Sequence, residues 1–210
     1  SETTTGNYNV AIGASALQVN TTGANNIAIG RASLYASTTA SNNTAVGFSA
    51  LTANTTGSDN TATGVDSLIA NTTGATNAAF GINSLMTNTT GGSNTAIGPA
   101  ALFSNTTASY NVAVGRDSLK ANTTGAENVA VGYQALKANT TATANTAVGT
   151  DSLLVNTAGN NTALGYYTLK ANTSGGSNTA LGDRTLRYNT TASNNTAVGY
   201  YALLQNTTGA

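Results

Sequence analysis

Seven carboxylates are the side chains best suited to acid–base chemistry in this 210-residue sequence, because it contains neither His nor Cys. Asp66, Asp117 and Asp151 recur at the same place in a repeated phrase, but in copies that are not neighbours. A general acid–base pair, or a site for a hard cation, needs its carboxylates close together. Imidazole and thiolate ligands for zinc are missing from the composition. The sequence therefore predicts no catalytic residue, no cofactor and no metal site, and we expect that the chain is not an enzyme.

Aromatic side chains offer binding rather than catalysis. Tyr166–Tyr167 and Tyr200–Tyr201 flank the oppositely charged pair Asp183–Arg184 one repeat away from each. Two tyrosine pairs around an ion pair could hold a sugar of a surface glycan. Packing between neighbouring repeats, or a contact inside a fibre, explains the same residues. Both interpretations stay open at this point.

Threonine recurs in pairs that begin at Thr21–Thr22, and a regular threonine row on a flat surface could bind ice. Neighbouring residues of a strand face opposite ways, so each repeat offers one outward Thr. The first Thr of the pair is never replaced, whereas the second becomes Ala158 and Ser174. We expect the first Thr to lie inside and to bond its turn. "NTT" is also a glycosylation motif at Asn20 and Asn54, but a ladder of stacked Asn explains it without glycans.

The elements that must position these residues follow from the repeat itself. The phrase "NTAVGYYALLQNTTGA" closes the chain, and near-copies begin about every 17 residues. One step, from Asn145 to Asn161, is 16 residues, and we expect the missing residue to fall in a turn. We number the copies as coils 1 to 12 and the residues within each as positions 1 to 17. The coils start at Asn9, Asn26, Asn43, Asn60, Asn77, Asn94, Asn111, Asn128, Asn145, Asn161, Asn178 and Asn195.

Seventeen residues are too few for a strand and a helix, and the phrase is rich in residues that are poor helix formers. The sequence therefore predicts an all-β fold: one parallel β-solenoid, or β-roll, of about twelve 17-residue coils over residues 1–210, with two short strands per coil. Parallel rungs repeat at about 4.8 Å, so twelve coils make a rod of about 58 Å. Both ends of the chain fall at the same phase of the repeat, which predicts a longer array or end-to-end stacking.

Invariant positions indicate the structural rows. Position 9 is always Leu and should line the core, together with position 11 and the mostly aliphatic position 4. Gly at position 5 indicates a left-handed corner. Asn at positions 1 and 12 and Thr at position 13 should form ladders from coil to coil. Representative residues of these rows are Leu17, Leu51, Leu119, Leu203, Gly115, Asn20, Asn54, Asn122, Asn206, Thr21, Thr55, Thr123 and Thr207.

Position 3 is Ala in every coil, as at Ala113, although it lies on the face opposite position 4. The residue type at a solvent-exposed position would vary between coils, so this restriction favours contact with a second chain in a homo-oligomeric bundle. The alternative is a monomeric coil in which Ala fits a flattened interior.

Charge excludes some partners. Only 7% of residues are charged and the net charge is zero, so no basic surface favours nucleic acid or a membrane. No apolar run approaches the length of a membrane helix.

The phrases "NVAIG" (9–13), "NIAIG" (26–30) and "NTAIG" (94–98) resemble the YadA-like head repeats of trimeric autotransporter adhesins. The unit here is longer and adds an "NTTG" segment. Similar repeat sequences occur in phage tail fibres and in large secreted bacterial fibre proteins. The resemblance implies a left-handed β-roll, three chains side by side and a location outside the cell.

Together these observations predict a structural or adhesive module of an extracellular filament or surface fibre, with other copies of itself, other fibre subunits or surface glycans as partners. An ice-binding solenoid that uses its threonine rows is the alternative, and a phage tail-fibre shaft in a virion is a variant.

Overall fold

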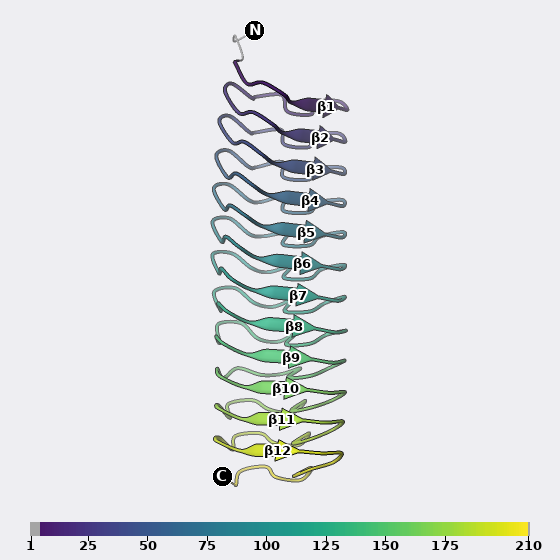
Figure 1. Ribbon diagram of the computed structural model, residues 1–210, viewed down its shortest axis with the longest axis vertical. Helices are drawn as coiled ribbons and strands as arrows, with labels where there is room; N and C mark the ends of the chain where they lie inside the picture. The colour runs from purple at the N-terminus through teal and green to yellow at the C-terminus, as the bar shows by residue number, and fades with distance from the viewer. Residues whose placement is uncertain (1–4, 210) are drawn as a thin grey trace.

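The computed structural model describes residues 5–209 as one column of parallel strands stacked along a single axis (Figure 1). Within that range it contains no helix, which confirms the predicted all-β parallel solenoid. Each strand pairs with its neighbours in sequence, in the order β1 to β12. The strands are Val10–Ile12 (β1), Ile27–Ile29 (β2), Thr44–Val46 (β3), Thr61–Thr63 (β4), Ala78–Phe80 (β5), Thr95–Ile97 (β6), Val112–Val114 (β7), Val129–Val131 (β8), Thr146–Val148 (β9), Thr162–Leu164 (β10), Thr179–Leu181 (β11) and Thr196–Val198 (β12).

The strand register follows the repeat without a slip. Ala113 of β7 lies opposite Ala130 of β8, and equivalent pairs continue in both directions. The short coil 9 keeps this register, since Thr146 of β9 pairs with Thr162 of β10. Its missing residue is absorbed between Asn156 and Asn161, outside the strands, as the sequence predicted.

Each coil has one three-residue strand, and the expectation of a second strand at positions 9 to 11 is wrong. That segment is a series of turns, because residues at positions 7 and 9 have left-handed backbone angles. In coil 7, Asp117 has a φ of 58° and Leu119 a φ of 48°. Position 17 is left-handed as well, as at Asn25 with a φ of 58°. Left-handed residues interrupt the alternation of a strand and turn the chain back on itself.

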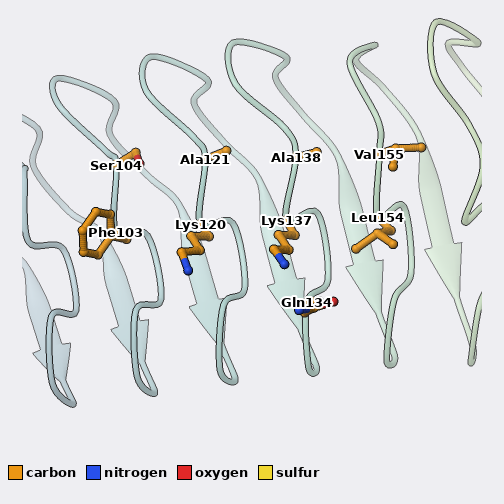
Figure 2. A pocket seen from close by; sticks show the side chains of 9 residues that line it. All are labelled: Phe103, Ser104, Lys120, Ala121, Gln134, Lys137, Ala138, Leu154 and Val155. Carbon is orange, nitrogen blue, oxygen red and sulfur yellow. The ribbon is translucent and has the colours of Figure 1, made fainter.

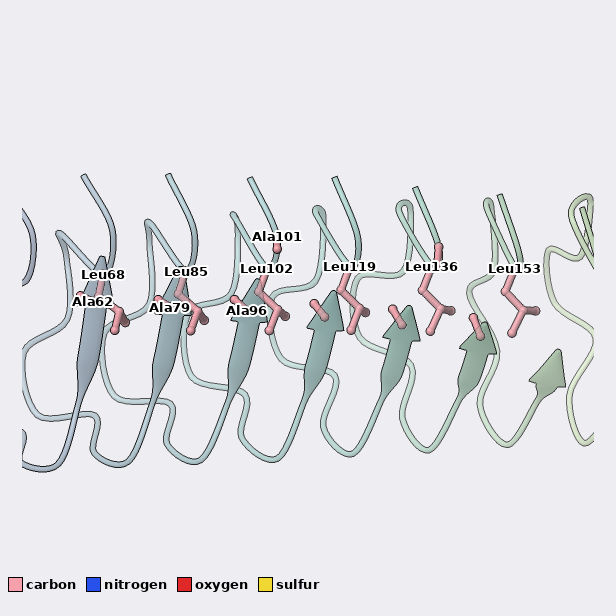
Figure 3. Packing of buried hydrophobic residues seen from close by; sticks show 14 of the residues in the cluster. Ala62, Leu68, Ala79, Leu85, Ala96, Ala101, Leu102, Leu119, Leu136 and Leu153 are labelled. Carbon is pink, nitrogen blue, oxygen red and sulfur yellow. The ribbon is translucent and has the colours of Figure 1, made fainter. Parts of the chain in front are cut away.

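The core is a thin double row of Leu and Ala side chains between the strands and these turns (Figure 3). Leu119 from position 9 and Ala113 from position 3 are both fully buried, and Leu51 is buried in the same row. In the terminal coils Leu17 is partly buried and Leu203 is half exposed. Small buried residues at position 8, such as Ser118, complete the interior. The prediction of an inward Leu row is confirmed.

Three other burial predictions are wrong. Position 4 points outward, as at Phe80, which lies beside Thr63 in the register but on the outer face. Position 11 is also outward, and Val155 is an exposed example. Ala113, expected against a second chain, lies in the chain's own core. For positions 3 and 4 the reason is that the middle residue of a three-residue strand faces one side and its two neighbours face the other. For position 11 the reason is that its segment consists of turns, so the alternation of a strand does not apply there.

Two asparagine ladders run along the rod, as predicted. At position 1, the Asn111 side-chain oxygen accepts the backbone N–H of Asn128 at 2.9 Å, and its Nδ2 donates to the Gly125 carbonyl at 2.9 Å. At position 12, the Asn122 Nδ2 donates to the same carbonyl at 2.9 Å and to Asn105 Oδ1 at 3.0 Å. Both ladders therefore meet at one carbonyl in each regular coil.

The position 12 ladder is interrupted at three places: at Ser37 in coil 2, at Asn156 in coil 9, and between coils 11 and 12, where Asn189 Oδ1 is buried without a partner. Ser37 replaces Asn in coil 2, and both its Oγ and the Asn20 Oδ1 of the previous coil are buried without a hydrogen-bond partner. In coil 9 the Asn156 Nδ2 donates instead to the Ala158 carbonyl, which leaves Asn139 Oδ1 unpaired. Asn54 donates to the Gly57 carbonyl at 2.8 Å, and Asn206 makes the same bond to Gly209 at 2.9 Å.

Threonine at position 13 forms the predicted ladder from coil to coil, but the expectation that it lies inside and bonds its own turn is wrong, because it is partly buried or exposed and its hydroxyl donates to the next coil. Thr21 Oγ1 donates to the Thr38 carbonyl at 2.9 Å, Thr55 to Thr72 at 3.1 Å and Thr123 to Thr140 at 3.1 Å. At the far end, the Thr207 carbonyl accepts the equivalent bond from Thr190.

Glycine at position 5 is required by both conformation and space. Gly115 has a φ of 125°, and a Cβ there would lie 2.6 Å from the carbonyl oxygen of Gly132 in the next coil. An L side chain fits neither condition.

Candidate functional site

The outer face of the sheet is one of two extended surfaces. Its side chains come from positions 2 and 4, which carry no charged residue in any coil. The row includes large exposed apolar groups, among them Ile12, Ile97 and Val198. Large exposed apolar patches are features that contact surfaces commonly have.

The second surface lies on the turn side of the rod, where positions 10 and 11 point outward (Figure 2). Position 11 supplies a floor of small residues, including Ala121 and Ala138. Position 10 supplies longer side chains beside it, including Lys120, Lys137 and Leu154. Together they form a groove of about 530 Å³, here called the position 10 groove.

A second hollow of about 280 Å³ continues this groove toward the C-terminus. The two share Leu154 and Val155, and the second ends at Tyr188. The groove therefore runs across the rungs, along the rod, from coil 6 to coil 11. Its lining is mainly aliphatic, with cations distributed along one side.

Those cations differ in their partners. Lys120 pairs with Asp117 at 2.9 Å, and Lys170 pairs with Asp151 at 2.8 Å. Burial raises the pKa of Asp117, but the hydrogen bond and charge of Lys120, with Lys137 and Arg116 nearby, outweigh it and leave that pKa below its usual value. Lys137 and Arg187 form no salt bridge with any residue in the range 5–209.

The tyrosine pairs predicted from the sequence are brought together with Arg184. The rings of Tyr166 and Tyr167 stack at 3.8 Å, and those of Tyr200 and Tyr201 meet edge-on at 4.2 Å. The Arg184 guanidinium lies 5.3 Å from the Tyr166 ring and 5.5 Å from the Tyr201 ring. It also pairs with Asp183 at 3.3 Å. One cation thus joins both tyrosine pairs.

This tyrosine cluster is continuous with the groove. The Lys170 ammonium lies 3.9 Å from the centre of the Tyr167 ring, and Arg187 lies 5.0 Å from the same ring and 5.1 Å from Tyr188. Cation–π contacts of this kind hold long side chains in place. The sequence indicated the tyrosines, but the groove was missed because position 11 was expected to face inward.

The arrangement gathers cations and aromatic rings along one groove but keeps the position 7 aspartates apart. Asp66, Asp117 and Asp151 stay in separate coils, and the two closer to the groove are taken up by lysines. Among residues 5–209 no group of three or more carboxylates is placed to hold a metal ion. The same residues include no helix that is long and apolar enough to cross a membrane.

No family model, curated protein or solved structure matches this chain.

Proposed function

We propose that this chain is a structural segment of an extracellular filament or surface fibre, on a cell or on a virion, which supplies length, stiffness and a surface for contacts. One observation carries the proposal: twelve strands stack in unbroken register, and asparagine ladders run beside them. A chain that repeats one 17-residue unit with so few interruptions forms a rod, and we infer that length and stiffness are the properties for which it is selected.

Energetics support a role that depends on repetition. Each coil buries one Leu, worth about 1.5–3 kcal/mol, whereas ordering a residue costs about 1.5 kcal/mol. A single coil is therefore unstable alone, and its stability comes from the coils above and below it. A rod of this kind gains stiffness from the same contacts that fold it.

Sideways self-association is the second part of the proposal. The outer sheet face presents Ile97 and Phe80 to solvent without any charge that would oppose contact. A second copy of the chain has the same face and complements it. Ala113 takes no part in this contact, because it is buried in the core.

Electron microscopy and light scattering of the purified chain test the proposal. We expect elongated particles and a mass above that of the 20.7 kDa chain. Ile97→Lys on the sheet face should reduce the mass and leave the β signal in circular dichroism. Thr107→Lys, at an exposed position outside the sheet, is the control and should change neither. Compact particles would contradict the rod, and an unchanged mass in Ile97→Lys would contradict the sheet-face contact.

Ice binding is a second candidate that one observation favours. Threonines at position 14, such as Thr56, Thr73 and Thr90, are exposed on the successive coils 3 to 5, and their hydroxyls bond no other residue of the range 5–209. The hydroxyls at position 13 are bonded within the ladder, so the threonines at position 14 form the row that faces solvent. Microscopy of ice growth in dilute protein distinguishes the candidates: faceted, arrested crystals favour ice binding, and unrestricted growth favours the filament.

A further inference from the structure

The position 10 groove carries charge in only one part of the rod. At position 10, coils 1 to 6 hold Gln18, Tyr35, Thr52, Ile69, Met86 and Phe103, none of them charged. Coils 7 to 11 hold Lys120, Lys137, Leu154, Lys170 and Arg187. The backbone is the same in both halves, so the fold itself does not require these cations.

These cations stand close enough to repel one another. Lys120 and Lys137 occupy neighbouring coils, as do Lys170 and Arg187, so each pair is separated by about one rung of 4.8 Å. Like charges at this separation repel one another. Asp117 and Asp151 offset one member of each pair. The other members, Lys137 and Arg187, form no salt bridge within residues 5–209, and Arg187 contacts the Tyr167 and Tyr188 rings instead.

We propose that the position 10 groove of coils 7 to 11, with Tyr188 at its end, binds an acidic polysaccharide that lies along the rod axis. This inference rests on the proposed role of the rod as a contact surface. The carboxylates of the sugar chain pair with Lys137 and Arg187, and the apolar faces of its rings lie on Ala121 and Ala138.

The geometry fits a linear polymer better than a single small anion. Lys137 and Arg187 stand on coils 8 and 11, so a ligand that pairs with both must cross four rungs. The groove is continuous over that distance, since its two hollows share Leu154 and Val155. The interval between neighbouring cations is comparable with the length of one sugar unit, so a polymer with a carboxylate on each unit can stay in step.

Single-stranded nucleic acid is the competing polyanion, and the tyrosines argue against it. Such binding depends on bases stacking on free aromatic faces. The Tyr167 ring is stacked on Tyr166 and covered by Lys170, with Arg187 also near it. The aromatic surface nearest the cations is therefore already occupied.

Isothermal titration calorimetry with polygalacturonate tests the inference, with neutral dextran and an oligo-dT strand as comparison probes. The full chain should bind polygalacturonate, bind it more weakly as salt is raised, and bind neither comparison probe measurably. Lys137→Gln places at position 10 a residue that coil 1 already carries there. That change should raise Kd several-fold, and the double variant with Arg187→Gln by about tenfold or more.

Arg31→Gln is the matched control, because it removes the same charge from coil 2, away from the groove. It should leave Kd within about twofold. No binding to polygalacturonate, equal binding of oligo-dT, or an equal loss in Arg31→Gln and Lys137→Gln would overturn the inference. Electron microscopy of the same samples separates the two proposals: rods that fail to bind refute the ligand and leave the filament standing.

Discussion

The break in the asparagine ladder at coil 2 predicts a substitution that stabilises the protein. Ser37→Asn places an amide where every other coil has one, next to the buried and unpaired Asn20 Oδ1. The new Nδ2 can donate to that oxygen and to the Ala40 carbonyl, and its oxygen can accept from the Asn54 amide. A net hydrogen bond contributes about 0.5–1.5 kcal/mol, and pairing a buried orphan group recovers about 1–3 kcal/mol. We expect a gain of about 1–3 kcal/mol in the free energy of unfolding.

The reciprocal substitution is Asn105→Ser in coil 6, which also has Ala at position 15, as coil 2 does. It removes bonds from Asn105 Nδ2 to Asn88 Oδ1 at 2.8 Å and to the Ala108 carbonyl at 3.0 Å, and an acceptor for Asn122. It should cost a comparable or larger amount.

Thermal unfolding measures both variants, and about 2–4 °C per kcal/mol is expected for a chain of this size. Because coil 2 lies near one end, hydrogen exchange of amides in coils 1 to 3 should be followed as well. Faster exchange there in Ser37→Asn, or equal shifts of the same sign in both variants, would refute the assignment of the ladder as a stabilising element.

Three further predictions concern the core, the corner and the charges. Leu119→Ala should cost about 2–5 kcal/mol, against less than about 1 kcal/mol for Lys120→Ala; urea denaturation compares them, and equal losses would contradict the inward Leu row. Gly115→Ala should lower the melting temperature far more than Gly176→Ala, where the nearest backbone atom is 3.3 Å from the new Cβ and φ is ordinary; similar melting curves would argue against the corner. The pKa of Asp117 is lower in the folded than in the unfolded chain, so this group adds to the free energy of unfolding above the unfolded pKa of about 3.9. That contribution is lost as pH falls through the folded pKa, so Asp117→Asn should flatten the acid side of a plot of stability against pH. An unchanged plot would show that the pair with Lys120 contributes nothing to stability.

The repeat was predictable because its invariant residues each meet a condition that no other residue meets. Gly115 has a left-handed angle and no room for a Cβ, and Asn111 needs both a donor and an acceptor on one short side chain. Such requirements leave a position unchanged through twelve copies, so the period, the ladders and the corner are visible in the sequence.

The path of the chain between the strands was not predictable from residue types. Leu is not a residue that normally adopts left-handed angles, so Leu119 at a φ of 48° gives no warning in the sequence. Alternation then placed positions 4 and 11 inside. Size offered the better signal: position 3 never departs from Ala, whereas position 4 ranges from Thr63 to Phe80. A close-packed interior holds one size, and a surface tolerates many.

The candidate groove was hidden for the same reason. Lys137 and Arg187 were visible as charges at a variable position, but only an outward position 11 creates a floor beside them. The tyrosine pairs were easier to predict, since in any solenoid each pair lies beside the residues at the same positions of the next coil, here Asp183–Arg184 of coil 11.

The left-handed residues at positions 7, 9 and 17 also govern how such a rod grows. Coils 1 to 11 each hold three of them outside glycine, and each costs about 1–2 kcal/mol relative to an ordinary backbone. A free segment therefore has little tendency to take this path on its own. A finished coil, in contrast, offers the next one a row of backbone groups, two Asn amides and a Leu already in place. The exposed edge of a finished coil therefore acts as a template for the next coil, so the rod grows by addition at its ends and new coils seldom form away from them.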